Sequence, residues 1–359
     1  MKRIVIEANI ISAPYCGLKE VMIQLGNGLA ARAQQLRRDH GVELAYVVPP
    51  AYRGCFGPDV EYVTMSGLSK HWLKHVGCGQ VDLFHAPHQY CTLKQVDGAR
   101  HTLLTIHDIN FMYEKHGSRL QRGIRRLQWR LDHADYLSFI SRFAQEDTAA
   151  HFKLEAPQRI IYNGVTDLTG LAASAPDGIL PELPERFFFH VSSLYPKKNV
   201  HLLVEMMKHL PEEHLVIAGT WQDDEYGRSL QLAIADAPHH NITTLDRISE
   251  EQKAVLYSRC RAFMFPSLCE GFGLPPIEAM KFGKPAFLST LTSLPEVGGD
   301  VAFYWPDLTP EAMAAEVRRG MAAADADPTL AARLRAHASQ FTWERCIDGY
   351  IAYYLDILG

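Results

Sequence analysis

The sequence has no apolar run long enough to cross a bilayer, which takes about 20 consecutive apolar residues in a helix. Glu7 and Asn9 interrupt the apolar stretch near the N-terminus, so we expect a first β-strand there and no signal peptide. The seven cysteines are scattered, and no pair has metal-ligand spacing, so we expect reduced thiols packed as small apolar groups. These absences favour a cytoplasmic protein without a disulfide framework.

A strong excess of one charge is also missing, because the net charge of the 359 residues is only −5. Residues 1–165 carry 20 basic and 15 acidic side chains, whereas residues 166–359 carry 16 and 26. The two halves therefore present different electrostatic fields to a partner. We expect no nucleic acid among the partners.

Predicted strands alternate with predicted helices in both halves, which indicates parallel sheets covered by helices. The strands expected in the first half are 3–8, 43–49, 82–86, 101–108 and 136–141. Those expected in the second half are 187–193, 214–219, 241–245, 262–267 and 285–290. Residues 166–185, rich in small side chains, Gly and Pro, are the predicted linker between two Rossmann-like domains. The aromatic helix expected at 341–358 either closes the second domain or crosses back onto the first.

The segment EGFGLPPIE follows a predicted strand and carries two glutamates, Glu270 and Glu278, around a glycine turn. Backbone amides of such a turn and of the following helix lie at partial positive potential, and glycines let an anion approach closely. A diphosphate fits against the turn amides, which belong to Gly271, Phe272, Gly273 and Leu274. We place Glu278 in the first helical turn, where its carboxylate suits ribose hydroxyls, and assign hexose hydroxyls to Glu270. The alternative is a helix-capping loop with an incidental glutamate.

Other candidate residues lie where strands meet helices. Lys197 and Lys198, in SSLYPKKN, either form a solvated turn or face an anionic ligand. His107 ends the strand in TIHDINF and is either structural or functional. The amide of Gly17 begins a predicted helix after the first strand, where a phosphate could bind. The G-x-G-x-x-A pattern at 26–31 falls inside that helix, so we expect its glycines to permit close helix packing.

The helix expected within 115–134 is basic, with an apolar stripe on one face. Its arginines are predicted to cover the remaining surface; they are Arg119, Arg122, Arg125, Arg126 and Arg130. This surface is either a solvated face or a contact with anionic lipid or an acidic acceptor. The D-x-D at 325–327 does not follow a strand, so we expect no metal-bound diphosphate there and no required metal.

Together these segments resemble a retaining glycosyltransferase of the GT-B fold, in glycosyltransferase family 4. The resemblance covers nearly the whole chain and rests on TIHDINF, SFISRFAQEDTAAHF, IIYNGV, YPKKN, CEGFGLPPIEAM, GKPAFLSTLTSLPEVGGD and the terminal FTWERC. It implies an α/β protein with two Rossmann-like domains facing each other across a deep cleft. Residues 1–165 would form the acceptor domain, with 341–359 crossing back onto it, and residues 186–340 the donor domain.

The resemblance also implies residue roles. Glu278 would bind the nucleotide ribose, Glu270 the transferred sugar, and Lys198 the diphosphate. His107 would reach the sugar from the other domain, Gly17 would belong to the loop near the phosphates, and Ile248 would flank the base. Many family members carry an arginine shortly before the lysine. Ser192 and Ser193 occupy that stretch here, and we expect Lys197 to supply the second charge.

The implied activity is hexosyl transfer that needs no metal or cofactor besides the nucleotide-sugar co-substrate. GDP-mannose is the expected donor, followed by UDP-glucose or a related UDP-sugar. The acceptor would be a glycan or glycolipid of bacterial envelope polysaccharide, as in lipopolysaccharide biosynthesis, met peripherally at the cytoplasmic face of the inner membrane. Two alternatives stay open: a nucleotide-sugar epimerase of the same fold and a non-catalytic nucleotide-sugar-binding protein.

Overall fold

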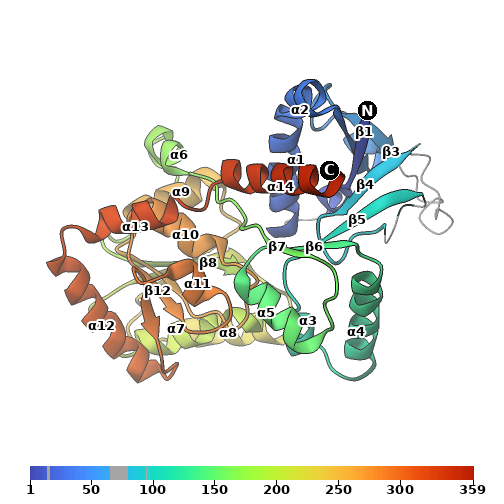
Figure 1. The fold of residues 1–359 in the computed structure, drawn as a ribbon. Helices are drawn as coiled ribbons and strands as arrows, with labels where there is room; N and C mark the ends of the chain where they lie inside the picture. Colours follow the sequence, from blue (N-terminus) through green and yellow to red (C-terminus); the bar gives the residue numbers. More distant parts are fainter. Residues whose placement is uncertain (14–16, 65–79, 94–95, 97) are drawn as a thin grey trace. The chain divides into compact units, whose positions relative to one another are not determined.

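The computed structural model describes residues 1–359 apart from 14–16, 65–79, 94–95 and 97. The chain forms two compact units, Met1–Gly164 with Phe341–Gly359, and Val165–Gln340. Each unit is a parallel β-sheet with helices packed against it (Figure 1). This is the predicted α/β architecture of two Rossmann-like domains.

The sheet of the first unit has seven strands in the order β3-β2-β1-β4-β5-β6-β7, and every pairing is parallel. The strands are β1 Lys2–Glu7, β2 Val42–Val48, β3 Glu61–Thr64, β4 Val81–Ala86, β5 Ala99–Ile106, β6 Tyr136–Phe139 and β7 Gln158–Ile160. The sequence does not predict β3 and β7, which are short, polar and at the two edges of the sheet. The other five match the expected strands.

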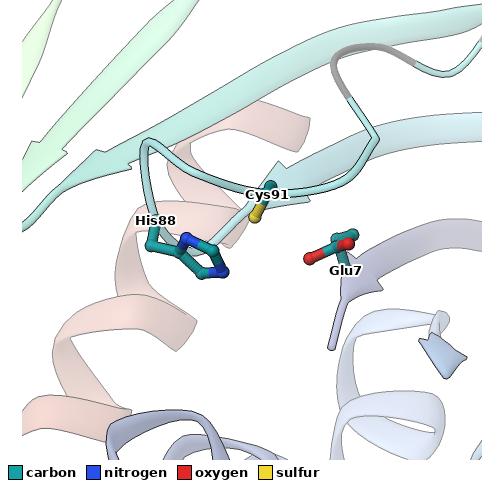
Figure 2. A group of neighbouring side chains, drawn as sticks. All are labelled: Glu7, His88 and Cys91. Carbon is teal, nitrogen blue, oxygen red and sulfur yellow. The ribbon is translucent and has the colours of Figure 1, made fainter. Parts of the chain in front are cut away.

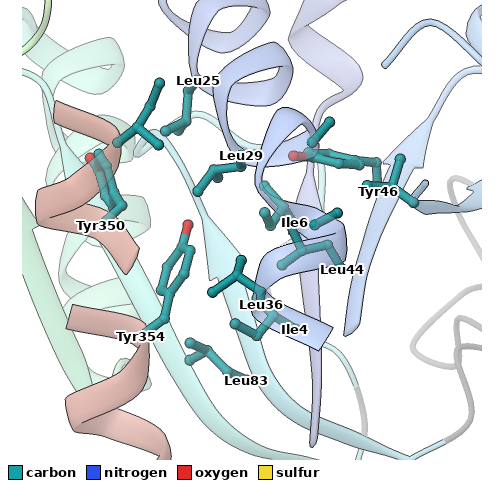
Figure 3. Close-up of a cluster of buried hydrophobic side chains, with 14 of the residues drawn as sticks. Ile4, Ile6, Leu25, Leu29, Leu36, Leu44, Tyr46, Leu83, Tyr350 and Tyr354 are labelled. Atoms are coloured by element: carbon teal, nitrogen blue, oxygen red, sulfur yellow. The ribbon is translucent and has the colours of Figure 1, made fainter. Parts of the chain in front are cut away.

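Helices cover both faces of this sheet. One face packs against α1 (Gly17–Ala31), α2 (Ala33–His40) and α14 (Trp343–Leu358), and Figure 3 shows Tyr350 and Tyr354 of α14 in that core. The other face packs against α3 (Phe111–Glu114), α4 (Gly117–Asp132) and α5 (Arg142–His151). The C-terminal helix is therefore part of the first unit.

The glycines at 26 and 28 permit close packing on α1, as predicted. A Cβ atom at Gly28 would overlap the Ile347 side chain of α14, and one at Gly26 would overlap the Phe56 ring. Close packing of Phe56 and of α14 against α1 accounts for these two glycines.

The sheet of the second unit has the order β10-β9-β8-β11-β12-β13, again with parallel pairings only. Its strands are β8 Phe188–Ser193, β9 Leu215–Thr220, β10 Ile242–Asp246, β11 Ala262–Phe265, β12 Ala286–Ser289 and β13 Phe303–Trp305. Its helices are α6 Thr169–Ser174, α7 Val200–Met207, α8 Glu225–Ala235, α9 Glu250–Arg259, α10 Leu274–Lys281, α11 Leu294–Gly298, α12 Pro310–Ala326 and α13 Leu330–Ala338. The edge strand β13 is the one that the sequence does not predict.

The predicted linker, 166–185, belongs to the second unit, which begins at Val165 and not at residue 186. Within it α6 packs against α9, and Gln252 of α9 donates a hydrogen bond to the carbonyl of Ile179 at 2.9 Å. Small residues and prolines thus form an irregular segment that is nevertheless anchored.

Of the described cysteines, Cys91, Cys260, Cys269 and Cys346 are buried and Cys55 is exposed, so the expectation of packed thiols is wrong for Cys55. Cys16 and Cys78 lie outside the described residues. Across the described ranges, no helix combines the length and apolarity that crossing a membrane requires.

Candidate active site

The predicted donor residues of the second unit gather at the carboxyl ends of its strands. Lys197 and Lys198 lie in a 3-10 turn after β8, and Glu270 follows β11. Because β8 and β11 pair side by side, these two connections meet at one edge of the sheet. Ligands of parallel sheets bind at this edge.

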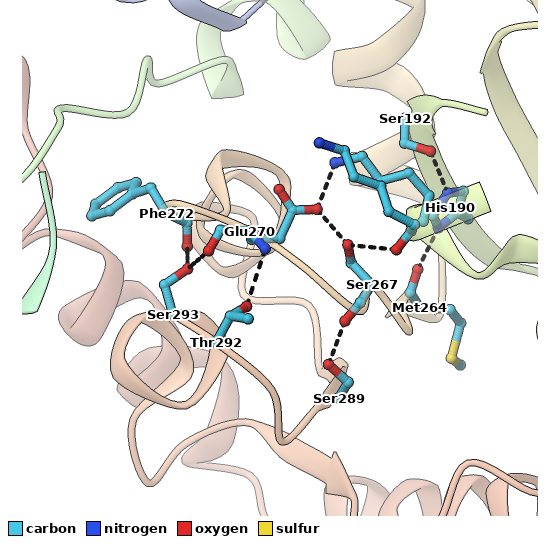
Figure 4. A network of polar contacts seen from close by, with 11 residues as sticks. His190, Ser192, Met264, Ser267, Glu270, Phe272, Ser289, Thr292 and Ser293 are labelled. Atoms are coloured by element: carbon cyan, nitrogen blue, oxygen red, sulfur yellow. Dashed lines mark hydrogen bonds and ion pairs between the residues drawn. The ribbon is translucent and has the colours of Figure 1, made fainter. Parts of the chain in front are cut away.

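Lys198 and Glu270 form an ion pair, with 2.5 Å between Nζ and Oε1. Their side chains are only 15% and 13% exposed. The Ser267 hydroxyl donates to the same carboxylate oxygen at 2.6 Å (Figure 4). The Lys198 ammonium lies 5.3 Å from the centre of the Phe265 ring. The sequence prediction that the two residues share one ligand site is consistent with this contact, although the pair itself was not predicted.

Hydrogen bonds to the main chain fix the connection that carries Glu270. The amide of Leu268 donates to the carbonyl of Lys197 at 2.8 Å, and the Ser289 hydroxyl donates to the carbonyl of Ser267 at 2.6 Å. The amide of Glu270 donates to the Thr292 hydroxyl at 3.1 Å. The main chain that carries Glu270 is therefore held from the segment that follows β8 and from β12 and the segment after it, and Figure 4 shows the contacts with Ser289 and Thr292.

The glycine turn needs a glycine at 273. Gly273 has a φ of +104°, and an added Cβ would lie 2.9 Å from Leu294 Cδ2. Helix α10 begins at Leu274, and Pro275 and Pro276 follow in its first turn. Pro275 and Pro276 lack N–H groups, so the amides that could meet a diphosphate come from the turn itself and from Leu274.

Glu278 lies in the second turn of α10, so its predicted place in the first turn is wrong. Its carboxylate accepts a hydrogen bond from the Tyr257 hydroxyl at 2.9 Å and lies 3.2 Å from the Lys253 ammonium. Glu278 is 11% exposed and Lys253 is 16% exposed. Both partners come from α9. The N-terminus of this helix is capped by a capping box of Ser249 and Gln252.

Burial and the Glu278 charge raise the pKa of Tyr257 well above its usual value, so the phenol stays a neutral donor. Burial alone would lower the pKa of Lys253, but the Glu278 and Glu250 carboxylates outweigh it and raise that pKa. The carboxylate of Glu278 is thereby oriented by one neutral donor and one cation.

Ile248 is half-buried between β10 and α9, at the same carboxyl edge as the two connections. Ser192, in the stretch shortly before Lys197, shares a 2.8 Å hydrogen bond with Nε2 of the buried His190. The imidazole also bonds to the Met264 carbonyl at 2.8 Å. Ser192 thus supports the sheet edge and brings no charge.

His107 directly follows β5 in the first unit and is buried. Its Nε2 donates to the Pro87 carbonyl at 2.9 Å, and its amide donates to the Gln89 side chain at 3.1 Å. Burial lowers the pKa of His107 to about 4, so the ring is neutral near pH 7. Gly17 is the exposed first residue of α1, as predicted.

The basic helix is α4, and four of its five arginines are exposed as expected. Arg130 is the exception, because it is 3% exposed and donates to the carbonyls of Cys91 and Leu93. Its predicted placement on the solvent face is wrong, because the side chain points inward and holds a loop.

The carboxylates of the D-x-D at 325–327 contact other side chains of the protein. Asp325 pairs with Arg261, and Asp327 contacts Thr329 and Arg333.

Two protein families match the chain. Residues 20–167 match the family described as Glycosyltransferase Family 4, and residues 177–336 match the one described as Glycosyl transferases group 1. The two parallel-sheet units carry these two matches in order. The chain therefore belongs to the GT-B glycosyltransferases that combine a family 4 N-terminal domain with a group 1 C-terminal domain.

Its curated relatives include mannosyltransferases. O-antigen chain mannosyltransferase B of Escherichia coli is 27% identical over 288 residues, which cover 76% of this chain and 74% of that protein. O-antigen chain mannosyltransferase RfbU of Salmonella typhimurium is 28% identical over 57% of this chain and 56% of its own. The serotype-specific mannosyltransferase WbdA of Escherichia coli is 34% identical over 45% of this chain, but the match spans only 20% of WbdA.

Solved structures share the fold over the whole chain. Sucrose-phosphate synthase from Thermosynechococcus elongatus superimposes with a TM-score of 0.78, at 19% identity and 99% coverage of both chains. Anabaena HepE, solved in complex with UDP and glucose, gives 0.77 at 18% identity and covers 99% of this chain and 100% of its own. At these identities the likeness concerns the GT-B fold.

Proposed function

We propose that the chain transfers mannose from GDP-mannose to a glycan or glycolipid of envelope polysaccharide, with retention of the anomeric configuration. Its relatives named as O-antigen chain mannosyltransferases support mannose as the sugar. UDP-glucose is the second candidate donor, because HepE was solved with UDP and glucose. The observation that carries the proposal is the contact between Lys198 and Glu270 at the sheet edge.

In the proposed reaction this pair opens when the donor binds. Lys198 turns from Glu270 to the donor diphosphate, and the freed carboxylate accepts hydrogen bonds from hexose hydroxyls. The acceptor hydroxyl attacks the anomeric carbon from the face that the diphosphate leaves. Lys198 and the turn amides stabilise the charge that develops on the leaving group, and the leaving phosphate takes the acceptor proton.

Transfer by this route requires no metal, because one ammonium and several amides face the diphosphate. Glu278 binds the ribose hydroxyls and Ile248 flanks the base. His107, neutral near pH 7, acts as a hydrogen-bond partner for the sugar and not as a cation. Gly17 and Lys197 provide further contacts to the phosphates.

The exposed arginines of α4 are proposed to hold the protein at an anionic membrane surface, where the acceptor is presented. The four side chains are Arg119, Arg122, Arg125 and Arg126. Each basic residue near such a surface contributes about 1 kcal/mol, which gives reversible attachment at low salt.

The test compares GDP-mannose alone with GDP-mannose plus a lipid-linked glycan extract, and follows the anomeric proton of donor and product by NMR. We expect a mannosylated product with the donor configuration, only when acceptor is present. Conversion of the donor without acceptor would identify an epimerase. Tight donor binding with no product in any extract would identify a binding protein, and transfer from UDP-sugars alone would exclude GDP-mannose.

A further inference from the structure

Three side chains that commonly bind metals meet in the first unit, where the loop after β4 also contacts His107. Glu7 ends β1, and His88 and Cys91 follow β4, which pairs with β1. A carboxylate oxygen, an imidazole nitrogen and the thiol sulfur all lie within 4.8 Å of one another (Figure 2). Glu7 and Cys91 are fully buried, and His88 is 3% exposed.

Two polar atoms of this cluster lack partners, although buried polar atoms are normally hydrogen-bonded. Oε2 of Glu7 and Nε2 of His88 have no hydrogen-bond partner, although the Cys91 thiol is hydrogen-bonded to the Glu7 carboxylate. The other carboxylate oxygen, Oε1, accepts from the Asn9 side chain at 2.7 Å and from the Thr92 amide at 3.1 Å. The unpartnered atoms therefore belong to side chains whose remaining contacts hold them in place.

The loop that carries His88 and Cys91 is fixed from outside. Arg130 of α4 donates to the carbonyl of Cys91 and, at 3.3 Å, to that of Leu93. The Gln89 side chain donates to the carbonyl of Asp108 at 2.7 Å. Supports of this kind keep potential ligands oriented before a metal arrives.

We propose that Glu7, His88 and Cys91 bind one divalent transition-metal ion of the zinc class. Thiolate, imidazole and carboxylate are the three ligand types of zinc sites, and the two anionic ligands neutralise its charge in a buried place. Tetrahedral zinc separates its ligand atoms by roughly 3.3–3.7 Å, so the side chains have to close by about 1 Å. The fourth position is left to water or another small oxygen ligand.

Metal binding changes the protonation state of Cys91 and the tautomer of His88. The ion has to displace the Cys91 thiol proton, because the thiolate is the form that binds metals. The Tyr90 amide donates to Nδ1 of His88 at 3.1 Å, which places the ring proton on Nε2. Coordination through Nε2 moves that proton to Nδ1 and exchanges the Tyr90 contact for the metal bond.

Cobalt(II) is the sharpest probe, because a cobalt–thiolate bond gives a charge-transfer absorption that histidine and carboxylate ligands do not. The whole chain, without a polyhistidine tag and stripped of metal, is titrated with Co²⁺ and then with Zn²⁺. We expect the absorption to saturate at about one cobalt ion per chain and to disappear when zinc displaces it. Absence of the absorption in the wild-type protein overturns the proposal and leaves a water-bridged Glu7–His88 pair as the explanation.

Matched variants assign the ligands. Cys91→Ser should abolish the absorption, whereas Cys346→Ser, which removes another buried thiol of the same unit, should retain it. His88→Gln should weaken cobalt binding by more than the roughly 10- to 100-fold that loss of an outer-shell partner causes. A Cys91→Ser protein that is folded by circular dichroism and still gives the absorption, or a Cys346→Ser protein that loses it, refutes this assignment.

Discussion

Replacing Glu278 by alanine should weaken binding of the nucleotide donor without unfolding the protein. A carboxylate offers about four acceptor positions, and Tyr257 and Lys253 occupy two of them. The remaining positions can accept from ribose hydroxyls. Hydrogen bonds to a charged group contribute roughly 1.5–3 kcal/mol, so the dissociation constant for GDP should rise about ten- to a hundredfold.

The fold should survive this change because the neighbours of Glu278 keep other partners. Lys253 remains 3.0 Å from Glu250, and the Tyr257 hydroxyl lies 3.3 Å from the carbonyl of Pro275. Tyr257→Phe is the matched control, since it removes one donor to Glu278 but leaves the carboxylate. Its effect on GDP affinity should be smaller than that of Glu278→Ala.

Isothermal titration with GDP and with an analogue that lacks the ribose hydroxyls separates direct contact from indirect effects. The wild-type protein should bind the analogue more weakly than GDP, whereas Glu278→Ala should bind the two almost equally. If the analogue loses the same affinity in both proteins, Glu278 does not contact the ribose. An unchanged dissociation constant for GDP in Glu278→Ala would refute the assignment outright.

Four other outcomes are expected. Lys198→Ala should lower kcat strongly and the melting temperature only slightly. Lys208→Ala, which breaks an exposed pair with Glu205, should change neither quantity. A Lys198→Ala protein with the wild-type kcat would show that Lys198 does not stabilise the leaving diphosphate. EDTA should leave transfer intact, and activity lost to EDTA but restored by magnesium or manganese would contradict metal-independent transfer. Gly28→Ala should lower the free energy of unfolding in urea by about 1–3 kcal/mol, because the added methyl group overlaps Ile347. Asn27→Ala, at an exposed position of the same helix, should not lower it. Equal free energies of unfolding for Gly28→Ala and the wild type would mean that α14 moves aside. Replacing Arg122, Arg125 and Arg126 with glutamine should reduce co-sedimentation with anionic vesicles at low salt and leave donor affinity unchanged. If the wild-type protein does not co-sediment with such vesicles, the arginines of α4 form only a solvated surface.

The sequence predicts the central strands of both sheets because strands buried on both faces read as apolar runs, such as FFFHVSS for β8. It misses β3, β7 and β13, which all lie at sheet edges. An edge strand pairs on one side only and can be short and polar. Its existence depends on the neighbouring strand more than on its own residues.

The donor site was predictable where its residues are close in the chain, as in the turn that links Glu270 to Glu278. Its supports were not. Tyr257 and Lys253 reach Glu278 from a separate helix, and no local pattern marks them. The burial of Arg130 was missed for the same reason. Its position in the helix is compatible with an exposed or a buried side chain, and its hydrogen bonds to carbonyls of a distant loop determine that it is buried.

The return of α14 to the first unit bears on how the chain folds during synthesis. Residues 1–164 leave the ribosome first, but Tyr350, Tyr354 and Ile347 complete their core only after the whole of 165–340 has been made. At roughly 5–20 residues per second that delay lasts on the order of 10–35 s. During it, the apolar face of α1 that includes Leu25 and Leu29 lacks its covering helix, so this part of the core stays incomplete until synthesis ends. The second unit is continuous in sequence, so it can fold before α14 has been synthesised and the first unit is complete.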